Sequence, residues 1–202
     1  MTIVRESALA IVKGYNRLPY EGRAILYTLP FGFGFITMEE TNGIKVHVDI
    51  PGTKNWNDII HDAEVEGVDF KTGKVFEGPL NQLNQFKDSV LHVLENLPDE
   101  ADVTFSGHSE GAVIAVLLAT MFKPSRLHLF ACPNVGNQTF IDYFKSLNIN
   151  TSHYAEARDK VPRFPLGLKQ VCEPTYLYFK EVNDFDELGQ HSILNIANHI
   201  DK

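Results

Sequence analysis

A serine between two glycines at a fixed spacing is the part of the sequence best suited to chemistry. Gly107-His108-Ser109-Glu110-Gly111 has the pattern G-x-S-x-G, which in a strand-to-helix turn holds a serine as an exposed nucleophile. The two glycines are explained by the turn itself, because a Cβ at either position would clash with the tight backbone around the serine. A chance match in a glycine-bearing loop is the alternative, and the flanking residues decide between the two.

The flanking residues have the pattern of a strand before the motif and a buried helix after it. Residues 101–106 are β-branched and aromatic in the manner of a short strand. Residues 112–122 are apolar nearly all round and contain no Gly or Pro before Pro124. Strand, sharp turn and buried helix are the context that a nucleophile elbow requires. We therefore predict that Ser109 is a catalytic nucleophile.

A serine nucleophile needs a base, which is usually a histidine oriented by a carboxylate. His191 follows the last predicted strand in a polar segment, which is where a base carried by a loop is expected. The other downstream histidines lie within predicted strands or the closing helix and are expected to be structural: His128, His153 and His199. We predict His191 as the base.

Asp159 is the favoured candidate for the carboxylate. It follows a predicted strand end and precedes Val161-Pro162, a rigid apolar turn, so it should lie at the C-terminal edge of the sheet, where α/β active sites form. An ordinary turn-capping aspartate is the alternative. The remaining candidates are Asp142 and two members of an acidic surface run, Asp184 and Asp186.

The tetrahedral oxyanion of such a reaction needs hydrogen-bond donors fixed in advance. The backbone N–H of the residue after the nucleophile, Glu110, is one expected donor. The second should come from an early strand-to-loop turn, and Gly52-Thr53 directly after the apolar strand that ends at Ile50 fits that role. We predict an oxyanion hole formed by Thr53 and Glu110.

The rest of the chain predicts an α/β fold with a mostly parallel sheet covered by helices on both faces. An Asn42-Gly43 turn indicates a hairpin between strands at 35–38 and 44–50. Strands are expected at 127–132, 151–155 and 175–179, and helices at 3–13, 80–97, 137–147 and 193–200. Without repeats or linkers, residues 1–202 are expected to form a single domain.

Composition excludes several classes of function. The net charge of −8 argues against binding to nucleic acid or anionic lipid surfaces. No apolar run reaches the roughly 20 residues of a membrane span. The first residues lack the pattern of a signal peptide, and two cysteines, Cys132 and Cys172, give no disulfide scaffold. We expect a cytoplasmic enzyme that uses no metal or cofactor; its oligomeric state is not indicated.

These motifs resemble those of the class 3 lipase family, serine esterases of the α/β-hydrolase fold. The resemblance runs in the family's order from about residue 34 to 195 and comprises five segments: Ile50–Asp58, Gly107–Ala112, Cys132–Phe140, Arg158–Pro165 and Gln190-His191-Ser192. It implies a carboxylic ester hydrolase that acts on a small-molecule or lipid ester through an acyl-enzyme. By the same resemblance, Ser109 is the nucleophile, Asp159 the acid and His191 the base.

The chain departs from the family pattern at several positions. Glu110 replaces the usual leucine, which raises the alternative of a catalytically weak scaffold that binds a partner; Lys54 or Arg163 could pair with its carboxylate. An acyltransferase, in which an alcohol replaces water in the second step, is a separate alternative. Pro51 replaces a basic residue, and Val75–Pro79 differs from the family's V-H-x-G-F. Little room for a lid helix remains between Thr53 and Trp56, so we expect a small lidless variant that acts on soluble esters or lysolipids.

Overall fold

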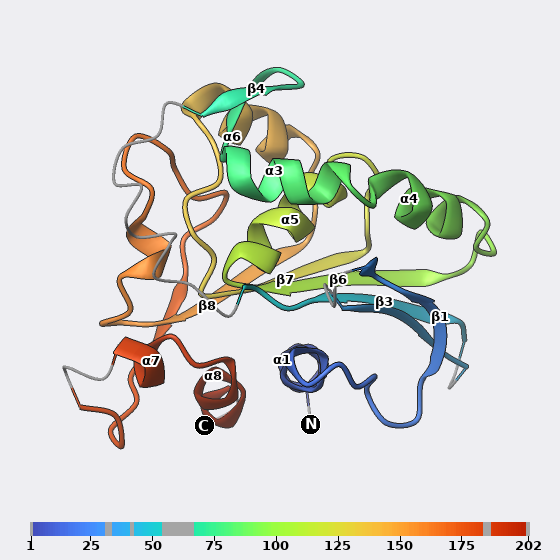
Figure 1. Ribbon diagram of the computed structural model, residues 1–202, viewed down its shortest axis with the longest axis horizontal. Helices are drawn as coiled ribbons and strands as arrows, with labels where there is room; N and C mark the ends of the chain where they lie inside the picture. The colour runs from blue at the N-terminus through green and yellow to red at the C-terminus, as the bar shows by residue number, and fades with distance from the viewer. Residues whose placement is uncertain (1, 31–33, 41–42, 54–66, 184–186, 201–202) are drawn as a thin grey trace.

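A seven-stranded sheet runs through the middle of the molecule (Figure 1). The computed structural model describes residues 2–30, 34–40, 43–53, 67–183 and 187–200 of the 202-residue chain. The strands of the main sheet are β1 (Ala24–Thr28), β2 (Phe35–Glu39), β3 (Lys45–Ile50), β6 (Asp102–His108), β7 (Arg126–Phe130), β8 (Thr151–Glu156) and β9 (Thr175–Leu177). A separate two-stranded sheet pairs β4 (Val68–Phe70) with β5 (Gly73–Val75).

The main sheet has the order β1-β2-β3-β6-β7-β8-β9. β3, β6, β7, β8 and β9 are parallel to one another, whereas at one edge β2 pairs antiparallel with β3 and β1 pairs antiparallel with β2. The predicted hairpin between the strands now named β2 and β3 is confirmed, although residues 41–42 of its turn lie outside the described ranges. β1 and the small sheet are additions that the sequence patterns did not predict.

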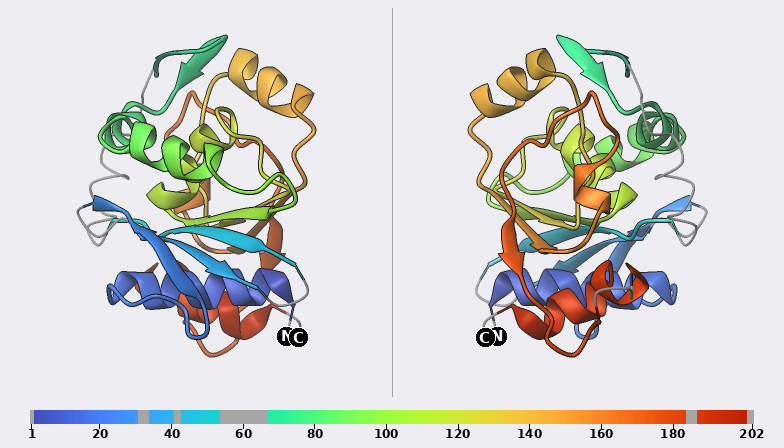
Figure 2. Two further views of the ribbon diagram at one scale, coloured as in Figure 1. Left: turned by 90° about the vertical axis from the view of Figure 1, so that its right-hand side faces the viewer. Right: turned by 90° about the vertical axis from the view of Figure 1, so that its left-hand side faces the viewer.

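Helices cover both faces of the sheet, as predicted. α1 (Ile3–Tyr15) and α8 (Ile193–His199), from opposite ends of the chain, lie side by side on one face (Figures 1 and 2). The opposite face carries α3 (Glu77–Asn84), α4 (Lys87–Glu95), α5 (Glu110–Ala119) and α6 (Gln138–Ser146). A short helix, α7 (Glu187–Gln190), precedes α8, and a 3₁₀ turn spans Val161–Arg163.

α5 is the central helix of this arrangement. Every one of its residues is buried, because the sheet covers one side of the helix and α3 packs on another. Contacts on all sides of α5 therefore explain the apolar run that predicted a buried helix. Burying apolar surface in such contacts stabilises the fold by about 25 cal/mol per Å². A rigid α5 gives the residue at its start a fixed position.

The single helix predicted over 80–97 is wrong, because the structure divides this segment into α3 and α4. The amides of Gln85 and Phe86 donate to carbonyls three residues back, at Gln82 and Leu83, which tightens and ends α3. Phe86 has φ −138° and turns its ring into the core. The turn lets α3 pack on α5 while α4 reaches β1, an outcome that helical periodicity alone does not contain.

The expected absence of a lid helix falls on residues 54–66, which lie outside the described ranges. The family-like Trp56 and Asp58 lie there too. Among the helices of the described ranges, none combines the length and the apolar character needed to cross a membrane.

A buried carboxyl group joins β3 to β6 near their C-terminal ends. The hydroxyl of Ser106 donates to Oδ1 of Asp49 at 2.5 Å, and the guanidinium of Arg23 lies 3.4 Å from Oδ2. Burial raises the pKa of Asp49 to about 6, and Arg23 and the Ser106 hydrogen bond partly oppose that shift. The two strands that lead to the candidate site are thus tied together by side chains as well as by their backbone.

Candidate active site

Ser109 lies in the strained turn that the sequence predicts. β6 ends at His108 and α5 begins at Glu110, so Ser109 is the single residue between them, with φ 56° and ψ −130°. Such a conformation is unfavourable for a residue with a Cβ and persists only where the surrounding structure enforces it. The backbone N–H of Ser109 donates to the carbonyl of Phe130 at 2.9 Å, which anchors the turn to β7.

The two glycines of the motif are required by close backbone contacts. A Cβ on Gly107 would lie 2.3 Å from the carbonyl oxygen of Gly111. A Cβ on Gly111 would lie 2.3 Å from the carbonyl oxygen of Ile50 and 2.6 Å from that of Pro51. The first contact lets α5 fold back on β6, and the second lets α5 approach the end of β3. Glycine at each position therefore brings the elbow against the predicted oxyanion turn.

His191 and Asp159 are hydrogen-bonded to each other. Nδ1 of His191 lies 2.8 Å from Oδ2 of Asp159, and both side chains are buried. The other carboxylate oxygen of Asp159 accepts the backbone N–H of Val161 at 3.0 Å. These two contacts fix the orientation of the carboxylate, and the bond to Nδ1 directs Nε2 of the imidazole away from Asp159.

The other sequence candidates lie elsewhere or have other partners. Asp142 is an exposed residue of α6 that accepts from the amide of Gln138, and Asp184 and Asp186 lie outside the described ranges. His128 bonds to Ser7, His153 accepts the backbone N–H of Cys132, and the ring of His199 packs at a tilt against Phe179. Each of these histidines therefore has a structural contact away from Ser109.

His191 is held close to the elbow through the neighbour of Ser109. The rings of His108 and His191 are 4.8 Å apart, and Nε2 of His108 donates to the carbonyl oxygen of His191 at 2.9 Å. Within the part of the chain that the structure describes, Oγ of Ser109 is buried and makes no hydrogen bond. Catalytic hydrogen bonds of a ligand-free site are often long and tighten when substrate is bound.

Arg158 anchors the loop after β8 that carries Asp159, here called the acid loop, and sequence reasoning did not identify this role. Its guanidinium pairs with the fully buried carboxylate of Glu156, with Nη2 2.7 Å from Oε1. It also donates to the carbonyl oxygens of Phe179 at 2.9 Å and Val182 at 3.0 Å. The residue before Asp159 thereby joins the acid loop to the segment that leads toward His191. The Arg158-Asp159 dipeptide is the sequence feature that could have indicated this role.

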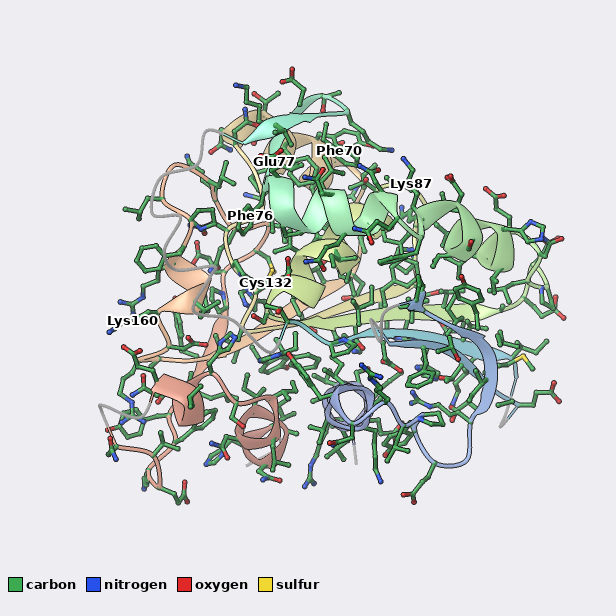
Figure 3. All side chains as sticks on the ribbon, in the orientation of Figure 1. Phe70, Phe76, Glu77, Lys87, Cys132 and Lys160 are labelled. Atoms are coloured by element: carbon green, nitrogen blue, oxygen red, sulfur yellow. The ribbon has the colours of Figure 1, made fainter. Side chains whose placement is uncertain are left out.

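An exposed ion pair lies at the outer edge of the same loop. Figure 3 shows Lys160 at the margin of the molecule, where its ammonium group lies 2.5 Å from a carboxylate oxygen of Glu187 at the start of α7. Both side chains are well exposed, so the pair is screened by water and contributes at most about 1 kcal/mol. The buried contacts of Arg158 are therefore the stronger constraint on this loop.

The predicted oxyanion turn packs directly on the elbow. A Cβ on Gly52 would lie 2.7 Å from the carbonyl oxygen of His108 and 2.8 Å from Cβ of Ser109. Thr53 is the next residue, and Glu110 begins α5 immediately after Ser109. The backbone amides of Thr53 and Glu110 thus come from segments adjacent to Ser109, and their role as donors stays a prediction.

The carboxyl group of Glu110 is buried against an amide on α3. Nε2 of Gln82 donates to Oε1 of Glu110 at 2.5 Å. Burial raises the pKa of Glu110, and the bond from Gln82 only partly opposes the shift. Of the two proposed cation partners, Arg163 instead donates to the carbonyl of Ala157, and Lys54 lies outside the described ranges. The carboxyl group of Glu110 therefore has an amide as its partner and not a cation, and burial opposes its ionisation.

The described residues around Ser109 offer no metal site and no disulfide. Among the described residues, no cluster of three or more His, Cys, Asp or Glu side chains has the arrangement of a metal site. Cys132 and Cys172 are both free thiols. Burial raises the pKa of Cys172 to about 11, so its thiol stays protonated at neutral pH.

Comparison with known proteins identifies the family. The family profile described as Lipase (class 3) matches residues 47–169, well over half of the chain. The match includes Ser109 and Asp159 and ends before His191. No curated protein matches the chain with significance.

Several solved lipases share the fold at low sequence identity. A lipase from Rhizopus microsporus var. chinensis is 23% identical over 80% of this chain and 67% of its own, with a TM-score of 0.68. The mono- and diacylglycerol lipase from Aspergillus oryzae is 18% identical over 98% and 92%, also with a TM-score of 0.68. A triacylglycerol lipase described as having a serine protease triad is 21% identical over 80% and 72%, with a TM-score of 0.65. These likenesses establish the α/β-hydrolase fold.

Gly111→Ala should test the contact between the elbow and the oxyanion turn. Its Cβ would meet two backbone carbonyls that cannot move independently of β3, so we expect the free energy of unfolding to fall by about 3 kcal/mol. Gly78→Ala is the matched control, because the nearest atom to its Cβ lies at 3.8 Å. It should change stability by less than about 1 kcal/mol. Equal effects of the two changes in urea denaturation would contradict the packing described.

Glu110→Gln should reveal the cost of burying a charge beside Ser109. The folded-state pKa of Glu110 is raised above its ordinary value near 4.5, so the wild type is relatively most stable below pH 4.5 and loses that contribution as the pH rises through the raised pKa. Glutamine cannot ionise and can still bond to Gln82. The variant should therefore gain stability relative to wild type with increasing pH, and parallel curves from pH 4 to 9 would refute a raised pKa.

Proposed function

The chain belongs to the class 3 lipase family, and on that premise we propose that it is a serine carboxylester hydrolase in which Ser109, His191 and Asp159 form the catalytic triad. The observation that carries this proposal is the buried bond between His191 and Asp159 beside an elbow serine with φ 56°. A serine in this conformation and a histidine in this orientation are the two parts that acyl transfer by a triad needs.

The first half of the reaction forms an acyl-enzyme. Asp159 accepts a hydrogen bond from the protonated Nδ1 of His191, which leaves the unprotonated Nε2 as the base. Nε2 removes the proton of Ser109 as its Oγ attacks the ester carbonyl, and the carbonyl π electrons move onto oxygen. When the tetrahedral intermediate collapses, the C–O bond to the leaving group breaks, and His191 gives the proton taken from Ser109 to the departing alkoxide oxygen, which leaves as an alcohol. The acyl group then remains bonded to Oγ of Ser109.

The second half of the reaction hydrolyses that ester bond with water. His191 removes a proton from water, the hydroxide attacks the acyl carbon, and Ser109 leaves with the proton from the imidazole. In both halves, the negative charge on the carbonyl oxygen would be stabilised by the backbone N–H groups of Thr53 and Glu110. Removing one such donor typically slows a serine hydrolase by about 100- to 1,000-fold.

The departures from the family pattern point to a soluble ester or lysolipid as substrate. The polar pair formed by Glu110 and Gln82 lies next to Ser109, where the family resemblance implies an apolar leucine. The sequence between Thr53 and Trp56 leaves little room for a lid helix. The hydrogen bond from Gln82 to the carboxyl group of Glu110 also weakens the case for a catalytically dead scaffold, because that case depended on an unpaired carboxylate beside the oxyanion.

Variants of the three proposed catalytic residues should lose activity together. Ser109→Ala and His191→Ala should each lower kcat on p-nitrophenyl acetate by about 1,000-fold or more, and Asp159→Asn should be nearly as damaging. Combining the changes should add little, because the residues act as one unit.

Asp142→Asn is the matched control for the acid, since Asp142 lies on the exposed surface of α6. It should leave kcat and labelling by a fluorophosphonate probe unchanged. Wild-type protein that takes up no probe would overturn the enzyme proposal in favour of a binding scaffold. Full activity of Asp159→Asn would overturn the choice of acid.

The proposed substrate class predicts simple kinetics without interfacial activation. The rate on a short-chain p-nitrophenyl ester should follow a hyperbola through the solubility limit, because no apolar lid would need to open at a lipid surface. The measurement is initial rate against ester concentration below and above emulsion formation. A sharp rise at the point of emulsion formation would contradict the proposal and indicate a lid.

A further inference from the structure

A tyrosine from the first helix is hydrogen-bonded to the segments around Ser109. We propose that Tyr15 is a positioning residue that, through His108, holds the oxyanion turn, the nucleophile elbow and the histidine loop in register. The inference rests on the proposed function of Ser109 and adds a residue that the triad and the oxyanion hole do not include. Tyr15 is the last residue of α1, far in sequence from every residue it would position.

Three hydrogen bonds link Gly52, Tyr15, His108 and His191 in series. The backbone N–H of Gly52 donates to the hydroxyl oxygen of Tyr15 at 2.9 Å. The hydroxyl proton of Tyr15 is then available for Nδ1 of His108, 2.7 Å away. Because Nδ1 accepts, the ring proton of neutral His108 is on Nε2, which donates to the carbonyl oxygen of His191 at 2.9 Å.

Each group along this series lies next to a proposed catalytic group. Gly52 precedes Thr53, a proposed oxyanion donor. His108 precedes Ser109, and the accepting carbonyl belongs to His191 itself. Tyr15 accepts the N–H of Gly52, the residue directly before the proposed donor Thr53. A single side chain thereby sets the separation between the oxyanion turn and the base.

Burial keeps the groups of this hydrogen-bond network in one protonation state. His108 is fully enclosed, and burial, together with the nearby His191, holds its pKa well below its ordinary value. Burial and the carboxyl group of Glu110 raise the pKa of Tyr15, although the N–H of Gly52 opposes the shift. Both groups therefore stay neutral, with the protons arranged as the hydrogen bonds require. Hydrogen bonds are stronger in such a low-dielectric setting than in water.

Catalysis depends steeply on the placement of these groups. A displacement of about 1 Å can lower a rate by about 100-fold, because reacting atoms must meet within a narrow range of distance and angle. Without the hydroxyl of Tyr15, the N–H of Gly52 and Nδ1 of His108 would lose their shared partner. The turn and the elbow would then lose the hydrogen bonds that join them through Tyr15.

Tyr15→Phe is the direct test, since it removes one oxygen and retains the ring that packs edge-on against His108. We expect kcat on p-nitrophenyl acetate to fall by about 10- to 100-fold with KM within about twofold. The second-order rate of fluorophosphonate labelling should fall in parallel. Tyr154→Phe is the matched control, because Tyr154 is a partly buried tyrosine packed on the same hydrophobic cluster as Tyr15. It should leave both rates unchanged.

A double-mutant cycle separates positioning from general stability. If Tyr15 acts through His108, adding Tyr15→Phe to His108→Phe should lower kcat by less than twofold beyond the His108 change alone. Additive losses would overturn the proposal, as would a Tyr15→Phe enzyme that melts earlier but keeps its kcat well below the melting temperature. Wild-type protein that does not label with the probe would instead overturn the proposed function, so the two failures are distinguishable.

Discussion

The parallel pairing of β3 with β6 places two functional turns side by side. Ile50 pairs with Gly107 at the ends of these strands, so the chain leaves the sheet at adjacent points toward Thr53 and toward Ser109. One step earlier, Asp49 pairs with Ser106, and their side chains share a 2.5 Å hydrogen bond. A one-residue slip would reverse the faces of all these side chains. The elbow, its glycines and the packing of α5 all depend on this register.

The sequence predicted the parts of the site that local patterns specify. The glycine spacing around Ser109 and the apolar run after it both reflect contacts that any such turn must make, and the class of fold followed from the order of strands and helices. Contacts between distant segments left no such pattern. Tyr15 and His108 are 93 residues apart, and the bond from Gln82 to Glu110 depends on where α3 ends. The break before α4 follows from the packing of Phe86, which helical periodicity does not report.

The surroundings of Ser109 are polar, but burial opposes charge on two of its neighbours. The pKa of His108 is lowered and that of Glu110 is raised, in each case chiefly by burial. Both shifts favour the neutral form. A weaker tendency to ionise matters because fixed charges act strongly in a region of low dielectric constant. In the proposed mechanism, oriented backbone amides stabilise the transient negative charge and need no reorganisation during the reaction.

The groups around Ser109 come from positions spread across the chain, from Tyr15 at the end of α1 to His191 after α7. Contacts of such long sequence separation form late in folding, since large loops must close before they can be made. Reactivity of Ser109 would consequently report on completion of the whole fold rather than on any one segment. A nascent or truncated chain could form β6 and α5 while its Ser109 remained unreactive. The reactivity of Ser109 could therefore be used to follow folding, either in refolding kinetics or in screens for chains that reassemble from two fragments.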